Sequence, residues 1–530
     1  MISRRSRLYL LAASLTLSSS ALAADWPVWG RDASRNMAAP QEKVVADFDP
    51  GKTVSPDSEE IDLKTTRNVR WVAKLGSQSY GNPTVADGRV YVGTNNDAPH
   101  RKTFKDDRSL VLCFDEKTGG FLWQLTVPKL GAGKVSDWEY LGVCSSPSVV
   151  GEQVFVVTYR CEVVCLDAQG LRNGNQGSQD EAKYFAGPDA EQPAPVDPEK
   201  DADILWVFDM RELGVFPHNI TSSSVLVVGD VVYATTSNGK DWTHSNTPNP
   251  SAPALIALDR KTGKLLGEEI SHISQRILHC NWASPTLATV KGPGDAQRDL
   301  ILFGAGDGFL YAFEPKPVRD EKEDLDVLKE VWRVDCNPPH YRVNPTNNKP
   351  LVYAKGETGP SEIIASPVFH DGLIYVCIGQ DPEHGPGWGN LTCIDAATGK
   401  AVWSSQAVGR TISTPAVHEG LVYASDYAGF VYCFDAKTGQ QHWKHDTQSH
   451  IWGSPLVANG QVILGNEDGV VTVLAVGKEK KLIREVETGA PIYSSAIAAN
   501  GVLYIGTQTH LYAVAPASAP APAPAPVPAP

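Results

Sequence analysis

The sequence predicts an all-β protein, an eight-bladed β-propeller of four-stranded antiparallel blades. The first observation is a unit of about forty residues that recurs along the chain: Trp403 and Trp443 are forty residues apart, and so are Asp395 and Asp435. The second is the content of the unit, which has a Ser-Pro step, a two-residue turn and an Asp-x-x-Thr-Gly turn. Forty residues in four short strands is the length of one propeller blade.

Each part of the unit has a physical reason. Proline is tolerated where the first strand begins, as in the Ser-Pro step at 454–455, because it need not donate to the ladder there. Asp-Gly, as at 371–372, then turns the chain, since both residues accept positive φ. The fourth strand carries a tryptophan four residues after the glycine of Asp-x-x-Thr-Gly, as from Gly439 to Trp443. A flat ring at a fixed place suits packing between neighbouring blades.

Eight first strands can be counted. They begin near residues 81, 145, 222, 283, 365, 413, 453 and 494. The last unit ends at 511–514 without a fourth strand after it, so we expect the segment 69–72 to complete that blade and close the ring. Closure removes the open sheet edges. Seven blades is the alternative if the third or fourth unit is degenerate.

The two ends of the chain are not part of the predicted propeller, which spans 24–515. Three arginines within residues 4–7, an apolar run at 8–17 and small residues up to Ala23 are typical of a secretory signal cleaved near Ala23. The run is shorter than the roughly 20 residues that span a bilayer. We therefore expect a periplasmic or secreted protein. Alanine and proline alternate in 516–530, which predicts a solvated, disordered tail.

Net charge and cysteine motifs limit the classes of partner and cofactor that we expect. The formal net charge of −14 argues against nucleic acid or an anionic membrane as the main partner. The chain has no Cys-x-x-Cys-His motif, so no covalent haem is expected.

Eight of the nine cysteines fall into two groups. Four precede the aspartate of the repeat by two residues, where alanine stands in other repeats, so buried thiols are expected there: Cys113, Cys165, Cys393 and Cys433. Four others are better disulfide candidates, although the sequence does not pair them: Cys144, Cys161, Cys280 and Cys336.

The repeat resembles that of the pyrroloquinoline-quinone (PQQ) type propeller family. The Ser-Pro step, the Asp-x-x-Thr-Gly turn and the following tryptophan carry the resemblance, and residues 25–32, Asp-Trp-Pro-Val-Trp-Gly-Arg-Asp, are similar to the start of that family's mature domains. The family includes quinoprotein dehydrogenases and non-catalytic scaffolds, among them an outer-membrane assembly lipoprotein. The resemblance therefore implies the fold and leaves the function open.

Long loops are predicted to gather on one face of the ring, around the mouth of the central channel. The turns between first and second strands are short, whereas the long segments follow second or fourth strands: 95–108, 128–142, 238–253, 337–363 and 380–390. Such loops on a rigid scaffold are where binding usually occurs. The acidic insertion 169–202 is expected on the opposite face as a mobile surface loop.

The favoured interpretation is an exported scaffold that binds or assembles partners through these loops. Residues just before the first strands should ring the channel: Tyr80, Asn82, Cys144, Asn219, Asn281, Trp282, Arg410, Trp452 and Tyr493. Arg410 and Trp452 suit an anionic or planar ligand, because a guanidinium pairs with carboxylates and an indole stacks on flat rings. The expected partner is a protein or such a small ligand. Packing of the inner strands is the alternative role for both residues.

The alternative function is a dehydrogenase of alcohols or sugars that depends on PQQ and calcium. The resemblance implies it: the loop from Asn238 to Trp242 is similar to the family's Gly-Asn-Gly-x-x-Trp loop, with Asn238 at the metal-ligating amide. Glu162 falls near the metal-ligating glutamate, and calcium needs such hard oxygen ligands. Otherwise Asn238 is a turn former and Glu162 a solvated strand residue.

Three departures make the active site of such an enzyme divergent. The chain has no pair of adjacent cysteines, and residues 219–224 lack the tryptophan expected beneath the cofactor. Asn281 stands where the catalytic aspartate is expected, and an amide cannot act as a general base.

Histidines 442, 445 and 450 lie close together in the sequence. On a β-strand, residues three apart face opposite sides, so a metal site at these histidines is not expected.

Overall fold

The computed structural model describes residues 24–516, except 102, 132–137, 178–179, 220–221, 293, 295, 354–358 and 385–386. The predicted signal, 1–23, and nearly all of the predicted tail lie outside the described residues. Within the described part of the chain, no helix is long and apolar enough to cross a membrane.

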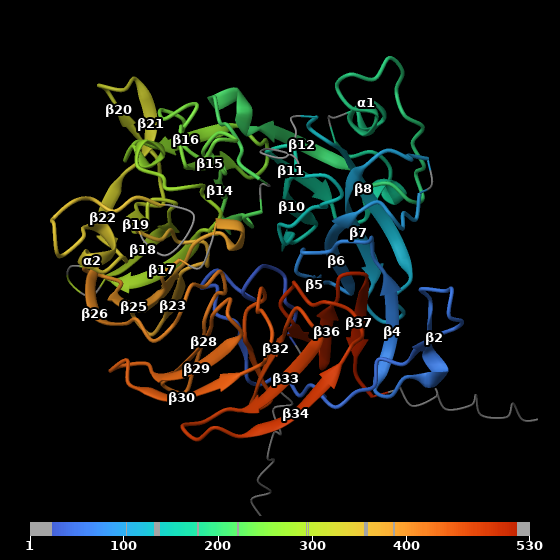
Figure 1. The fold of residues 1–530 in the computed structure, drawn as a ribbon. Helices are drawn as coiled ribbons and strands as arrows, with labels where there is room; N and C mark the ends of the chain where they lie inside the picture. The colour runs from blue at the N-terminus through green and yellow to red at the C-terminus, as the bar shows by residue number, and fades with distance from the viewer. Residues whose placement is uncertain are drawn as a thin grey trace, which may run out of the picture.

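Eight sheets surround a central axis, which confirms the eight-bladed propeller (Figure 1). The first strand of each blade lies innermost; these strands are β5 (Thr84–Ala86), β9 (Ser148–Val150), β13 (Leu226–Val228), β17 (Thr286–Lys291), β23 (Val368–His370), β27 (Ala416–His418), β31 (Leu456–Ala458) and β35 (Ile497–Ala499). The second strands are β6 (Arg89–Asn95), β10 (Gln153–Thr158), β14 (Val231–Thr235), β18 (Gln297–Gly304), β24 (Leu373–Ile378), β28 (Leu421–Ser425), β32 (Gln461–Gly465) and β36 (Val502–Gly506).

The outer half of each blade continues the antiparallel order. The third strands are β7 (Arg108–Asp115), β11 (Glu162–Asp167), β15 (Leu255–Asp259), β19 (Phe309–Phe313), β25 (Asn390–Asp395), β29 (Phe430–Asp435), β33 (Val470–Ala475) and β37 (His510–Val514). The fourth strands are β8 (Phe121–Pro128), β12 (Ile204–Asp209), β16 (Leu265–Glu269), β22 (Glu330–Asp335), β26 (Lys400–Ser405), β30 (Gln441–Asp446), β34 (Leu482–Glu487) and β4 (Val69–Lys74).

The ring closes through β4. This strand pairs antiparallel with β37, with Ala73 opposite Leu511, so a strand from before the first blade completes the last one. The segment predicted at 69–72 lies within β4.

The residue at the serine position of the Ser-Pro step links neighbouring blades. Its backbone N–H donates to the side-chain oxygen at the same place in the next blade, as from Ser224 to Ser284 (2.9 Å) and from Thr414 to Ser454 (2.9 Å). Ser495 continues the series by donating to Asn82 at 2.6 Å, across the junction between the last and first blades. A hydroxyl is therefore repeated here because it satisfies a backbone donor that faces the channel.

An N-terminal plug, residues 24–42, crosses the face that carries the short turns between first and second strands. Its backbone bonds to the first strands of separate blades, including Trp26 to Val85 and Met37 to Val457. Arg35 is fully buried and donates to three carbonyls at 2.8 to 2.9 Å, among them those of Val225 and Pro285. The plug therefore lies across the end of the channel opposite the long loops.

The insertion after β11 packs differently from the prediction. It contains α1 (Glu181–Ala186), whose Phe185 is fully buried, and its backbone bonds to β8 through Lys200 and Gln124 at 2.8 Å. Asp201 of the insertion forms a buried ion pair with Arg101 of the 95–108 loop. The insertion starts on the opposite face, as predicted, because Gln169 and Arg172 lie beside the short turn at 87–88. The expectation of a loose surface loop is wrong, since the rest of the insertion is anchored along the neighbouring blade.

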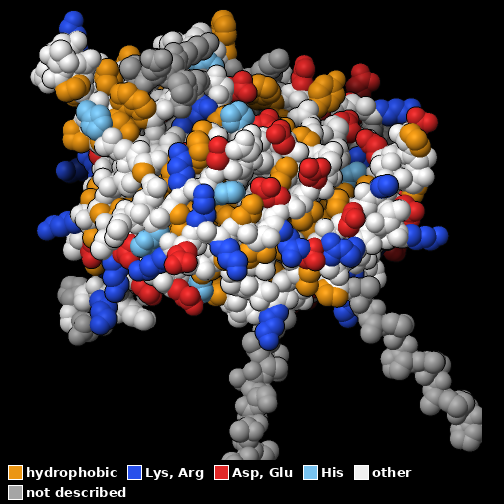
Figure 2. Space-filling view, turned by 60° about the horizontal axis from the view of Figure 1, so that its bottom comes forward, with side chains coloured by type: hydrophobic (Ala, Val, Ile, Leu, Met, Phe, Trp, Pro, Cys, Tyr) orange, Lys and Arg blue, Asp and Glu red, His pale blue; other side chains and the backbone are white. Residues whose placement is uncertain are grey.

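The remaining elements are short. They are β1 (Ala38–Ala39), which pairs with β31, the hairpin of β2 (Lys52–Thr53) and β3 (Ile61–Asp62), the hairpin of β20 (Val318–Asp320) and β21 (Leu325–Leu328), which extends the third blade, and α2 (Pro339–Arg342). Acidic and basic side chains are interspersed over the face of the molecule seen in Figure 2.

All nine cysteines are free thiols. The four in the repeats are buried, as predicted. The expectation of disulfides among Cys144, Cys161, Cys280 and Cys336 is wrong. The thiols of Cys161 and Cys280 face backbone carbonyls instead, those of Thr236 at 3.3 Å and Ser237 at 3.2 Å.

Candidate functional site at the channel mouth

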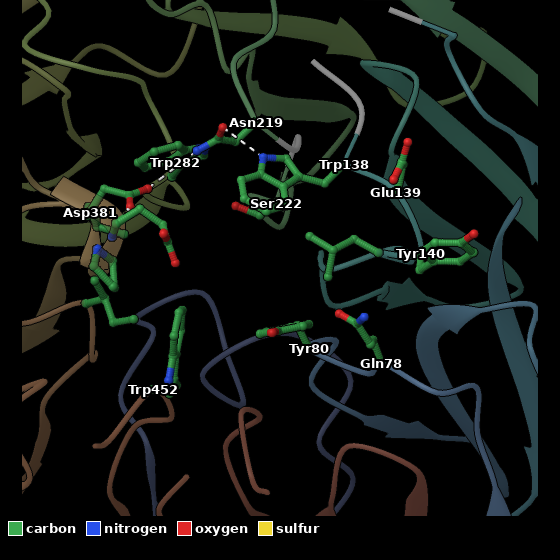
Figure 3. A pocket seen from close by; sticks show the side chains of 15 residues that line it. Gln78, Tyr80, Trp138, Glu139, Tyr140, Asn219, Ser222, Trp282, Asp381 and Trp452 are labelled. Carbon is green, nitrogen blue, oxygen red and sulfur yellow. Dashed lines mark hydrogen bonds between the residues drawn. The ribbon is translucent and has the colours of Figure 1, made fainter. Parts of the chain in front are cut away.

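A well opens at the mouth of the central channel. Its upper chamber has a volume of about 430 Å³, and side chains from several of the predicted long loops surround it (Figure 3). A lower chamber of about 210 Å³ shares part of this lining and reaches Trp29 of the N-terminal plug. The indole of Trp29 donates to Ser366 at 3.0 Å, which holds it at the bottom. The well therefore opens toward the long loops and has the plug at its other end.

Aromatic side chains form much of the wall. Trp138 comes from the loop after β8, Trp282 precedes β17 and Trp452 precedes β31. Tyr80 stacks on Tyr493 with ring centroids 4.5 Å apart, and Trp452 stands perpendicular to Tyr493 at 5.6 Å. The rings support one another, so the wall presents flat apolar surfaces to a ligand.

Carboxylates occupy the same mouth. Asp381 and Glu383, from the loop after β24, and Glu139 line the upper chamber. Burial raises the pKa of Asp381, while nearby His279 lowers it. Asn219 joins two loops, because its amide oxygen accepts from Trp138 at 3.1 Å and its nitrogen lies 3.5 Å from Asp381 (Figure 3).

Seven of the nine residues predicted to ring the channel line one of the two chambers: Tyr80, Asn82, Cys144, Asn219, Trp282, Trp452 and Tyr493. Arg410 lies beside the mouth. Its guanidinium stacks 4.5 Å over Tyr427 and points at the carbonyls of Asp381 and Pro382, at 3.5 and 3.4 Å. Trp452 lines both chambers and donates to Glu467 at 3.2 Å.

Asn238 and Asn281 lie behind the wall, fully buried and in contact with each other. The amide of Asn238 accepts from Phe216 at 2.8 Å and donates to Asn249 and Ser274 at 3.0 Å. Asn281 donates to the carbonyl of Asn238 at 3.2 Å and accepts from Gly306 at 2.8 Å. Both side chains thus hold loop backbone in place.

Glu162 and Trp242 lie apart from that pair. The Glu162 carboxylate is paired with Arg160 at 2.9 Å and accepts from Tyr184 at 2.8 Å. Trp242 is 75% exposed. The structure therefore places Asn238 beside Asn281 behind the wall, and it places Arg410 and Trp452 at the mouth. Glu162 and Trp242 lie apart from both pairs.

The residues present do not fit PQQ with calcium at the predicted positions. Calcium takes six to eight oxygen ligands. The carboxylate oxygens of Glu162 already accept hydrogen bonds from a guanidinium and a phenol. The amide oxygen of Asn238 accepts from a backbone N–H, and the two residues share no hydrogen-bond partner.

Sequence reasoning missed a cluster of three histidines behind the wall. His218, His244 and His279 each offer a ring nitrogen, and these nitrogens all lie within 4.8 Å of one another. The fully buried Glu362 faces the cluster, its Oε1 3.7 Å from Nδ1 of His279. Burial raises the pKa of the Glu362 carboxyl to about 8. The cluster gives no short sequence motif, because its members come from three separate loops.

A protein-family model described as outer membrane protein assembly factor BamB matches residues 106–277, 328–429 and 389–519, which is more than half of the chain. The chain belongs to this family of PQQ-like β-propellers. No curated protein sequence matches this chain.

Two solved structures share the fold of this PQQ-like propeller. BamB from Moraxella catarrhalis is 14% identical with a TM-score of 0.51, over 84% of this chain and 96% of that one. A europium-containing methanol dehydrogenase is 13% identical with a TM-score of 0.54, over 92% and 98%. At these identities the likeness concerns the fold alone.

Proposed function

We propose that this PQQ-like propeller is a binding protein that receives a segment of a partner protein in the well at the channel mouth. The observation that carries the proposal is the well itself, an aromatic-walled cavity of about 430 Å³ surrounded by long loops. Pockets of this size on a rigid scaffold are the usual places for recognition. The matched family model is described as an assembly factor, which agrees with a binding role.

The chemistry of the well favours a segment with an apolar or aromatic side chain next to a lysine or arginine. Trp138, Trp282 and Trp452 offer flat apolar faces, and such faces also attract cations. Carboxylates at the rim and the net charge of −14 add attraction for a basic segment. The expectation of an anionic ligand rested on Arg410, whose guanidinium points at two backbone carbonyls.

The proposed location is the periplasm or the extracellular space. It rests on the secretory pattern of residues 1–23. A partner of the same compartment is therefore proposed.

Selection from a random-peptide library on the purified protein tests this function. The expected result is enrichment of peptides in which Trp, Tyr, Phe or Leu lies beside Lys or Arg, with enrichment lost for the double variant Trp138→Ala, Glu383→Gln. The matched control is Trp242→Ala, which removes an exposed indole that does not line the well. Acidic or unrelated peptides, or equal enrichment by the double variant, would overturn the proposal.

A further inference from the structure

We propose that His218, His244 and His279 bind a divalent transition-metal ion behind the wall of the well. The proposal goes beyond peptide binding and does not depend on it. Three imidazole nitrogens within 4.8 Å of one another form the donor set. Imidazole suits zinc, copper, nickel and cobalt, whereas calcium and magnesium prefer oxygen ligands.

The spacing of the nitrogens fits such an ion. Nδ1 of His244 lies 3.1 Å from Nε2 of His279. Two nitrogens bound tetrahedrally at about 2.0–2.1 Å from zinc are separated by roughly 3.3 Å. This pair is therefore already at ligand spacing, and His218, whose ring nitrogen lies within 4.8 Å of both, offers the third nitrogen.

Neighbouring groups present the correct nitrogen of each buried ring. Nδ1 of His218 lies 2.5 Å from the carbonyl oxygen of Lys240, which can only accept, so Nδ1 carries the hydrogen and Nε2 keeps its lone pair. Nδ1 of His279 faces Glu362 at 3.7 Å and the hydroxyl of Tyr353 at 3.5 Å, which leaves Nε2 toward the cluster. A carboxyl group on the far side of a histidine ring is a common support of a metal ligand.

The backbone brings the three loops together in a fixed order. Single β-bridges join Pro217 to Asn238 and Gly239 to Cys280, so the Asn-Gly pair lies between the segments that carry His218 and His279. A Cβ on Gly239 would lie 2.3 Å from Cβ of His218, so only glycine allows this approach. Backbone contacts between the loops therefore bring His218 and His279 together.

The ion would brace the wall of the well. Asn219, next to His218, lines the upper chamber, and the ring of Trp282 lies 5.1 Å from that of His279. His218 and His279 are fully buried, whereas His244 is partly exposed and offers a route of entry. A bound metal would therefore tie together three loops that support one side of the mouth.

The test uses chelator-treated full-length protein titrated with Zn²⁺ by calorimetry and with Co²⁺ by visible absorption. We expect one site per chain, the d–d bands of nitrogen-bound Co²⁺ and a rise in the thermal midpoint with Zn²⁺. His244 has a φ of 57°, which asparagine tolerates, so His244→Asn removes the imidazole and keeps the turn. This variant should weaken binding at least about 100-fold, and Glu362→Gln about 10- to 100-fold.

His450→Asn is the matched control, because His450 lies near the same mouth, stacked on Tyr427, outside the cluster. It should bind Zn²⁺ as the wild type does. The proposal is overturned if the folded wild type shows no one-to-one binding, or if His244→Asn and His450→Asn bind equally well.

Discussion

The indole nitrogen of Trp403 donates a hydrogen bond to the carbonyl oxygen of Ala436 in the next blade, at 3.0 Å. Trp443 makes the equivalent bond to Gly477 at 2.9 Å. The ring of Trp403 also packs against Gly439, at the Asp-x-x-Thr-Gly turn of that next blade. The periodic tryptophan and the periodic glycine are therefore two halves of one contact between blades.

Replacing Gly439 with alanine should destabilise the ring more than the same change at Gly460. Both glycines have a φ near +70°, so both substitutions cost about 1–2 kcal/mol of backbone strain. Only at Gly439 would the new Cβ meet the indole, 2.6 Å from Trp403, whereas Gly460 faces open space. The extra loss should be about 1–3 kcal/mol, measured as a lower urea midpoint. Equal midpoints for the two variants would show that the indole contact is unimportant.

Arg35→Ala should lower the free energy of unfolding by about 3 kcal/mol or more, because three buried carbonyls lose their donor. Arg35→Lys should recover part of the loss, since an ammonium cannot reproduce the fork of the guanidinium. Arg89→Ala, at the first residue of β6 and half-buried, is the control and should change little. The measurement is chemical denaturation; a midpoint for Arg35→Ala within error of the control contradicts the role of the plug.

Because of Glu269, we expect the folded protein to lose stability as pH rises. Burial raises the pKa of this carboxyl to about 7, from an ordinary value of about 4.5. Because the pKa is higher in the folded protein than in the unfolded chain, the contribution of Glu269 to the free energy of unfolding is complete below about pH 4.5. It is lost as pH rises through 7, by about 3 kcal/mol in total. Thermal midpoints of wild type and Glu269→Gln between pH 5 and 8 measure it. The glutamine variant should show a smaller decline; parallel curves would place the pH dependence elsewhere.

PQQ with millimolar Ca²⁺ should change neither the absorption spectrum nor the thermal midpoint. The reason is that Asn238 and Glu162 bond to separate protein groups. Asn238→Ala should instead cost about 2–4 kcal/mol of stability without any ligand, because three buried hydrogen bonds are lost. A rise in midpoint with PQQ that disappears in Asn238→Ala would establish a quinoprotein site.

The sequence predicts the parts of the fold that depend on local repetition. The eight blades follow from spaced turns and tryptophans, and closure by β4 follows from the missing fourth strand after β37. Residues before the first strands line the channel because every blade places that position alike, as with Tyr80 and Trp452.

The parts that depend on contacts between distant segments were not predictable. Arg35 is recognisable as structural only when Val225 and Pro285 are known to lie beside it. The three clustered histidines are 26 and 35 residues apart and follow no ligand spacing, whereas the neighbouring histidines at 442–450 do not form such a cluster in the described structure.

The most direct test of the binding function is the dissociation constant of one selected basic-aromatic peptide, measured by calorimetry for four proteins. We expect at least about tenfold weaker binding for Trp138→Ala, because one indole of the wall of the well is lost. Glu383→Gln should weaken binding at low salt and less so at high salt, since its carboxylate is exposed. Trp242→Ala should bind as the wild type does. Unchanged binding by Trp138→Ala, or equal weakening by Trp242→Ala, would contradict a ligand in the well.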